Sequence, residues 1–201
     1  MERIIQMISV YTDGSATKNR SGWGWIAIYP GGQQEHESGT SINATNQRME
    51  LMAALRALIW WKREGYCRWS DNDDITIYTD SAYLYNCWKD KWWVNWENNG
   101  WRNAQKNPVA NMDLWKYLIT FFRDPQVSFE KVKGHSGHTY NELADKLATG
   151  AISAANAKEL QIQEKNDKIN IELSEILLDY SMKKYPVDET IRRIRKACNC
   201  G

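Results

Sequence analysis

Residues 45–65, TNQRMELMAALRALIWWKREG, limit the possible folds of this chain more than any other stretch does. The interior of this segment is apolar on most sides, Thr45 or Asn46 can cap its start, and Gly65 stands just past its expected end. A helix that is apolar on most sides has to be buried by other elements. We therefore expect a helix over residues 46–63 that packs against a sheet.

The strands for such a sheet lie on both sides of this helix in the sequence. Apolar runs predict strands over residues 3–12, 74–79 and 126–133, and Gly/Trp alternation predicts one over 22–29. The hairpin turn Pro30-Gly31-Gly32 predicts that residues 33–41 return as an antiparallel strand. Further helices are expected after the capping residue Ser81, over 111–122 and over 139–150, with a Trp-rich polar stretch over 88–107. This order of elements predicts an α/β fold, in which a mixed sheet carries helices on its faces.

Length and composition narrow the class of protein. The chain has 201 residues, which is long enough to bury a core. Its formal net charge is +1, so it carries no overall positive charge that would attract nucleic acid. Four cysteines are too few for a disulfide framework, and the Cys198/Cys200 pair alone is a weak metal signal. We find neither a secretory signal nor a run of about 18 apolar residues, hence we expect a cytoplasmic protein without a membrane span.

The character of the sequence changes after Gly150. Apolar residues between Ile162 and Tyr180 recur on one helical face, separated by charged residues, and Pro186 ends that pattern. We expect one domain over residues 1–150 and a helical extension of unknown role over 151–201. The extension could dock on its own domain in a monomer, which is our first expectation, or mediate self-association or contact with a partner protein.

Four carboxylates stand in settings where a charge is unexpected. Asp13 and Asp80 follow apolar runs in YTDGS and IYTDS. Glu50 lies inside the apolar helix, and Asp145 begins the apolar part of NELADKLA. Each has a structural explanation by itself, such as an Asp-Gly turn or an acidic residue favoured by a helix dipole. Carboxylates gathered near a core repel one another, however, so the group of four needs a cation.

The chemistry of this group indicates which cation. Carboxylate oxygens without a Cys/His set favour Mg²⁺ or Mn²⁺ over zinc. Two such ions about 4 Å apart suit in-line phosphoryl displacement, in which one activates water and the other stabilises the leaving oxygen. The residues alone therefore predict a metal-dependent phosphoryl-transfer site.

Five motifs together make residues 4–150 resemble type 1 ribonuclease H: YTDGS, TNQRMELMAAL, IYTDS, NPVANMDLW and VKGHSGHTYNELADKLA. The resemblance implies a ribonuclease H-like fold, with a mixed five-stranded sheet of three antiparallel strands and then two parallel ones, flanked by helices. It also implies an endonuclease that cuts the RNA strand of RNA–DNA hybrids by two-metal-ion catalysis and leaves 3′-hydroxyl and 5′-phosphate ends. Mg²⁺ is the implied cofactor, as two ions with substrate bound, and Mn²⁺ is a possible substitute.

The resemblance assigns catalytic roles to five residues. The family's metal-binding quartet maps onto Asp13, Glu50, Asp80 and Asp145. Asp13 would bridge both ions and Asp145 would hold one of them. Glu50 and Asp80 would complete the shell of the ion near the attacking water. His135, between glycines in KGHSGH, corresponds to a mobile-loop histidine that would shuttle protons or help to expel the product phosphate.

The resemblance also assigns contacts to the substrate. Asn46 and Gln47 match positions that read 2′-hydroxyl groups of the RNA, and Asn19 is a further candidate. Amides suit that task because, like the 2′-hydroxyl, they both donate and accept hydrogen bonds. Thr45 and Asn111 match residues that seat a phosphate of the DNA strand.

Residues 87–108 resemble the family's protruding handle, which grips the DNA strand. Trp92, Trp96 and Trp101 fall in its tryptophan positions, although these rings could instead mainly hold the handle together. The sequence WENNGW replaces a cluster that is often basic in relatives, so the remaining handle cations are Lys89, Lys91, Arg102 and Lys106. A second departure is Asn43, where relatives can carry an arginine beside the phosphate seat.

Two other functions are compatible with such a fold. One is a different nuclease or a transposase, because a fold does not determine an activity. The motifs TNQRME and KGHSGH argue against it, since the resemblance assigns their residues to contacts with RNA sugars and to product release. The other is a catalytically inactive hybrid-binding or scaffold protein, against which the intact quartet argues.

We predict that this protein binds hybrid more weakly, and with less sensitivity to salt, than a relative with a basic handle. Each phosphate contact adds about one unit to the slope of log K against log salt concentration. Titrations of a labelled hybrid at several salt concentrations measure this slope. With only four cations in the handle, a slope steeper than about −6 would contradict the prediction.

Overall fold

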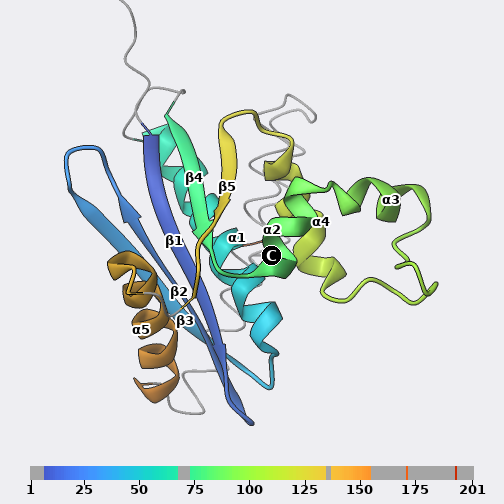
Figure 1. Cartoon of the computed structure of the whole chain (residues 1–201), viewed down its shortest axis with the longest axis horizontal. Coiled ribbons are helices and arrows are strands. Elements are labelled where there is room, and N and C mark those ends of the chain that lie inside the picture. The colour runs from blue at the N-terminus through green and yellow to red at the C-terminus, as the bar shows by residue number, and fades with distance from the viewer. Residues whose placement is uncertain (1–6, 68–72, 135–136, 155–170, 172–192, 194–201) are drawn as a thin grey trace, which may run out of the picture. The chain divides into compact units, whose positions relative to one another are not determined.

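The structure, a computed structural model, describes residues 7–67, 73–134 and 137–154, together with residues 171 and 193. The chain divides into two compact units, Met1–Ala155 and Asn156–Gly201, and the labelled helices and strands of Figure 1 belong to the first. Several predicted features lie outside the described residues: His135, most of the helix expected after residue 150, Cys198 and Cys200. The division at residue 150 and the role of the extension stay predictions.

A five-stranded sheet forms the centre of the first unit (Figure 1). In chain order its strands are β1 (Met7–Ala16), β2 (Arg20–Ile28), β3 (Gln34–Ile42), β4 (Asp74–Thr79) and β5 (Val127–Lys131). In space they follow the order β3-β2-β1-β4-β5. β2 pairs antiparallel with β1 and β3, whereas β4 is parallel to β1 and β5. This arrangement confirms the predicted α/β fold with a mixed sheet.

Helices lie on both faces of this sheet. The described helices are α1 (Asn46–Cys67), α2 (Ala82–Lys89), α3 (Trp92–Asn98), α4 (Met112–Phe122) and α5 (Thr139–Ala154). α5 packs on β1, β2 and β3, whereas α1 packs on β1 and β2 and is itself contacted by α4 (Figure 1). Every side chain from Leu51 to Leu58 is buried, as the apolar character of this stretch predicts. None of the described helices is long and apolar enough to cross a membrane.

Two glycines allow both helices to approach the sheet closely. A Cβ atom on Gly24 would lie 2.6 Å from Leu147 Cβ in α5, and one on Gly14 would overlap the backbone nitrogen of Glu50 in α1. Gly24 pairs with Asp13, the residue before Gly14. Because successive residues of a strand face opposite sides of the sheet, α5 and α1 lie on opposite faces.

Several elements differ from the sequence prediction: α5 continues past residue 150 to Ala154, and β5 ends at Lys131 rather than at residue 133. β1 does not end near residue 12 but continues to Ala16, because β2 keeps pairing with it as far as Ser21. α1 does not end before Gly65 but at Cys67, because one glycine costs a helix only about 1 kcal/mol, which a long buried helix tolerates. The Trp-rich polar stretch over residues 88–107, for which no element was predicted, contains α3, whose Trp96 is buried.

We predict that Gly24→Ala destabilises the protein, because the new methyl group would collide with Leu147 in α5. Overpacking of this kind costs about 1–3 kcal/mol in the free energy of unfolding. Gly31→Ala is the matched control, since a Cβ atom at Gly31 meets nothing within 4 Å. Urea denaturation of both variants and the unmutated protein measures the effect. Equal stability of all three would contradict the close packing of α5 on β2.

Candidate active site

The register of β1 and β4 brings Asp13 and Asp80 next to each other. Thr12 pairs with Thr79 in the last parallel position of the two strands, and an aspartate follows each of them directly. β4 ends at this point, whereas β1 continues along β2. Asp13 is 9% exposed, and Asp80 is half-buried. The two carboxylates thus meet where the parallel pairing stops. The sequence predicted Asp13 at the end of its strand, whereas in the structure Asp13 lies within β1.

Glu50 reaches the same region from α1. The side-chain amide of Asn46 donates to Glu50 Oε1 at 2.8 Å, and the Ser81 side chain also hydrogen-bonds to this carboxylate. Burial raises the pKa of Glu50, the bond from Ser81 lowers it, and the charge of Asp80 raises it again. Because Ser81 directly follows Asp80 and caps α2, the same loop positions Asp80 and supports Glu50.

Asp145 completes the group from α5, which packs closely on β2. Burial raises the pKa of Asp13 to about 7, and the neighbouring charge of Asp80 contributes next. The Gly14 N–H, which donates to Asp13 Oδ1 at 2.7 Å, lowers this pKa, and the charges of Asp145 and Glu50 raise it. The structure thus brings the other three predicted carboxylates within electrostatic reach of Asp13.

A divalent cation fits this group by its chemistry. The four side chains offer only carboxylate oxygens, which are the ligands of Mg²⁺ and Mn²⁺. A cation would also remove the mutual repulsion that raises the pKa of Asp13. Among the described residues, no three acidic, histidine or cysteine side chains are already drawn together as a metal cage. The carboxylates Asp13, Glu50, Asp80 and Asp145 are the residues that would hold such ions.

The loop after β5 lies against this group. A Cβ atom on Gly134 would lie 2.5 Å from Asp80 Oδ2, so any larger residue there would displace the carboxylate. Lys131, the last residue of β5, donates to the backbone carbonyl of Asp80 at 3.2 Å and lowers the pKa of Glu50. His135 is the next residue after Gly134 but lies outside the described residues.

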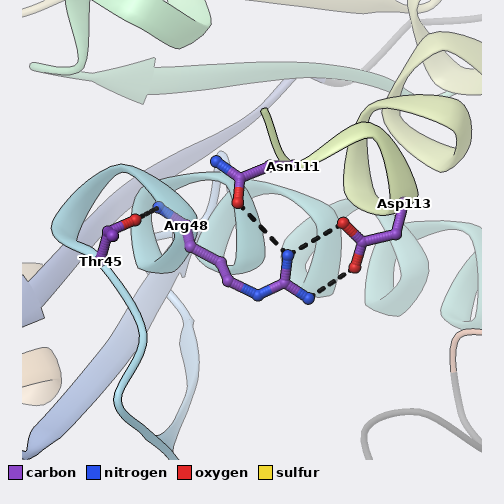
Figure 2. Close-up of polar contacts among 4 residues, drawn as sticks. All are labelled: Thr45, Arg48, Asn111 and Asp113. Carbon is purple, nitrogen blue, oxygen red and sulfur yellow. Dashed lines mark hydrogen bonds and ion pairs between the residues drawn. The ribbon is translucent and has the colours of Figure 1, made fainter. Parts of the chain in front are cut away.

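The predicted substrate-contacting residues lie at the surface near the start of α1. Thr45, Asn46 and Gln47 are exposed, as is Asn19 in the turn between β1 and β2. Thr45 caps α1, since its Oγ1 accepts the backbone N–H of Arg48 at 3.2 Å. The guanidinium of Arg48 in turn contacts Asn111, so the two residues predicted to seat a DNA phosphate meet at Arg48 (Figure 2).

The predicted handle tryptophans pack on one another and on α4. Trp96 is buried, and its ring centroid lies 5.5 Å from that of Trp115 in α4. Trp92 and Trp101 are half-buried, with centroids 6.5 Å and 6.4 Å from that of Trp96. The Trp115 indole N–H donates to the Tyr83 hydroxyl at 3.1 Å, which ties this cluster to α2. Trp96 therefore contributes to holding the handle together.

Sequence reasoning missed several residues that support the site. Ser81 was predicted only as a helix cap, whereas it also hydrogen-bonds to Glu50. Arg48 and Asp113 stand inside the motifs TNQRME and NPVANMDLW but have no local signal, because their contact joins segments 65 residues apart. The close fit of Gly134 to Asp80 likewise depends on tertiary structure.

The fold and the site have counterparts among known proteins. A profile described as RNase H matches residues 6–153. The ribonuclease H of Syntrophomonas wolfei is 45% identical over 148 residues, which cover 73% of this chain and 97% of that protein. The crystal structure of LC9-RNase H1, a type 1 RNase H with the type 2 active-site motif, is similar with a TM-score of 0.61 and 25% identity, over 78% of this chain and 76% of that chain. The structure of LC11-RNase H1 in complex with RNA/DNA hybrid, at 21% identity, shares the fold with a TM-score of 0.53, over 73% of this chain and 96% of that chain.

We predict that Asp13→Asn stabilises the metal-free protein at neutral pH. Because the pKa of Asp13 is raised to about 7 by folding, the folded state binds this proton more tightly than the unfolded chain. Stability is therefore lost as the pH rises from about 4 to 7 and the carboxyl ionises. The neutral amide can still accept the Gly14 N–H and avoids that loss, which is on the order of 4 kcal/mol above pH 7.

Thermal unfolding in EDTA between pH 5 and pH 8 measures the effect of Asp13→Asn. The stability of the variant relative to the unmutated protein should grow with pH over this range. A difference that does not change with pH, or a variant that is less stable at pH 8, would contradict the burial and repulsion inferred for Asp13.

Proposed function

The chain belongs to the RNase H family, and from this premise we propose that it is an endonuclease that hydrolyses the RNA strand of RNA–DNA hybrids. The expected enzyme class, ribonuclease H, is confirmed by curated relatives of that name that are 40–45% identical. We further propose cleavage with two divalent ions, Mg²⁺ or as a substitute Mn²⁺, to leave 3′-hydroxyl and 5′-phosphate ends.

The convergence of Glu50, Asp80 and Asp145 on Asp13 is the observation that carries this proposal. The group comes from β1, α1, the end of β4 and α5, so it depends on the packing of the whole sheet and both of its covering helices. Like charges brought together near a core destabilise a fold. A protein that only bound hybrid would gain nothing from holding these charges together, whereas a metal-dependent nuclease needs them as metal ligands.

The carboxylates take the roles that the family resemblance implies. When bound, the ions would supply a polarised attacking water and a stabilised leaving oxygen. Asp13, nearest the centre of the group, would contact both ions. Glu50 and Asp80 would hold the ion near the water, and Asp145 would hold the other. His135 would exchange protons or help to release the product phosphate.

Recognition of the RNA sugar is coupled to this group through Asn46. The Asn46 Nδ2 donates to Glu50, which leaves its Oδ1 as an acceptor for the hydrogen of a 2′-hydroxyl group. A deoxyribose lacks that hydrogen, so Asn46 would place ribose rather than deoxyribose beside Glu50. The exposed amides of Gln47 and Asn19 would provide further contacts to the RNA strand.

The DNA strand would be held at two places. Thr45 and Asn111 would seat one phosphate, and the handle would contact the strand farther away. Because Trp96 is buried in the handle, contact with deoxyribose is left to Trp92 and Trp101. A monomeric state and a cytoplasmic location stay predictions from the sequence.

We predict that the protein, supplied with Mg²⁺ or Mn²⁺, cuts only the RNA strand of a labelled hybrid and leaves RNA and DNA duplexes intact. EDTA should abolish cutting, because the carboxylates need a cation to act. The labelled products, resolved on a denaturing gel, should carry 3′-hydroxyl and 5′-phosphate ends. Cutting of DNA, or cutting that survives EDTA, would exclude this function.

Two variants separate the enzyme from a hybrid-binding scaffold. Asp13→Asn should lose cleavage by several orders of magnitude while it still binds hybrid. Asp74→Asn is the matched control, because Asp74 begins β4 and lies at the opposite end of that strand from Asp80. Cleavage that is unchanged in Asp13→Asn would favour a different site, and cleavage that is lost in both variants would indicate misfolding.

A further inference from the structure

Arg48 contacts both residues that are proposed to seat the DNA phosphate (Figure 2). Its backbone N–H donates to Thr45 Oγ1 at 3.2 Å, and its guanidinium Nη1 donates to Asn111 Oδ1 at 3.3 Å. Thr45 caps α1 and Asn111 precedes α4, so a single residue connects the starts of two helices. Arg48 is therefore placed to control the geometry between these two side chains.

The contact with Arg48 determines which way the Asn111 amide faces. A guanidinium has only hydrogen-bond donors, so the amide oxygen must point toward Arg48. The Nδ2 group of Asn111 then points away from Arg48, as Figure 2 shows. Asn111 has a left-handed backbone with φ of 56° and forms no side-chain cap bond to α4. Its side chain is thus oriented by Arg48 rather than by its own helix.

The same logic applies to Thr45. Its hydroxyl oxygen accepts the N–H of Arg48, which leaves the O–H as a donor. Thr45 and Asn111 consequently both offer a hydrogen-bond donor next to the N-terminus of α1, where an anion is favoured by the helix dipole. A phosphate oxygen accepts hydrogen bonds and donates none, so it matches this pair of donors.

Asp113 holds the guanidinium in place. Its two carboxylate oxygens bond to Nη1 and Nη2 of Arg48 at 2.9 Å and 2.5 Å (Figure 2). Such a paired contact fixes the plane of a guanidinium, which a lysine could not reproduce. The hydrogen bonds and charge of Arg48 lower the pKa of Asp113, so the pair is ionised at neutral pH and its charges cancel.

We propose that Arg48, held by Asp113, is a positioning residue whose guanidinium orients Asn111 beside the helix-capping Thr45, so that the two side chains form a paired hydrogen-bond donor for one phosphate of the DNA strand. The proposal rests on the proposed function and adds a residue to it that touches no substrate itself. It explains how a seat that carries Asn43 in place of an arginine can still be selective for a phosphate. The seat acts through oriented donors rather than through a net positive charge.

The sign of one mutational effect distinguishes positioning from simple electrostatics. Asp113→Asn removes a negative charge beside the seat, so electrostatics alone would tighten the binding of a polyanion. If Asp113 instead holds Arg48 in position, the same variant should weaken binding. We expect Asp113→Asn, Arg48→Met and Arg48→Lys each to raise the Kd for hybrid about fivefold or more, because a hydrogen bond to a charged group is lost.

Fluorescence anisotropy with a labelled hybrid in EDTA measures these Kd values without turnover. Lys62→Met is the matched control, because Lys62 pairs with Asp124 after α4 and is 32% exposed, like Arg48. It should change Kd by less than about twofold. With Mg²⁺ and saturating hybrid, kcat of the Asp113 and Arg48 variants should stay within about twofold of the unmutated protein, because only binding is affected.

Hybrids with one uncharged methylphosphonate in the DNA strand test the seat itself. At one position, the methylphosphonate should weaken binding to the unmutated protein more than it does at neighbouring positions. This extra loss of affinity should vanish in Arg48→Met and Asp113→Asn. Tighter or unchanged binding by Asp113→Asn, or an extra loss that persists in both variants, would overturn the proposal. Should Arg48→Met not fold, Asp113→Asn alone decides. Failure of the proposed function would show separately, as an unmutated protein that binds hybrid but does not cut it.

Discussion

The point where β1 and β4 stop pairing is the constraint on which the rest of the site depends. Thr12 and Thr79 are the last partners of the parallel pair, and an aspartate follows each of them. β1 is held beyond this point by β2, so Asp13 stays in a fixed strand. Asp80 instead starts the loop into α2, where Ser81 caps the helix. Two like charges are thereby placed side by side by backbone geometry rather than by any attraction between them.

The surrounding packing has to offset the repulsion among these charges. Burial and neighbouring carboxylates raise the pKa of Asp13 to about 7, which means that the ionised group destabilises the fold. The opposing contribution comes from the apolar layers: α1 on one face of the sheet and α5 on the other, brought close by Gly14 and Gly24. A change in either layer would therefore alter the geometry of the carboxylates as well as the stability of the core.

The first two turns of α1 connect the parts of the site. Asn46 and Glu50 are four residues apart, so they share one face of the helix and hydrogen-bond there. Arg48 lies between them and faces α4, where it meets Asn111 and Asp113. Sugar recognition, metal binding and the proposed phosphate seat are therefore spaced by the geometry of a single helix, which rises about 1.5 Å per residue.

The fold class and the four candidate carboxylates could be predicted from the sequence alone. An apolar helix between apolar strands requires a covered sheet, and the motifs around Asp13, Glu50, Asp80 and Asp145 are local enough to be read without a structure. The strand at residues 74–79 and the cap at Ser81 were also predicted, because they depend on neighbouring residues. Other features could be found only in the folded chain: Asp13 lies within a continuing strand, Trp96 is buried against Trp115, and Arg48 contacts both Thr45 and Asn111. These features depend on contacts between segments far apart in the chain, which local propensity and periodicity do not encode.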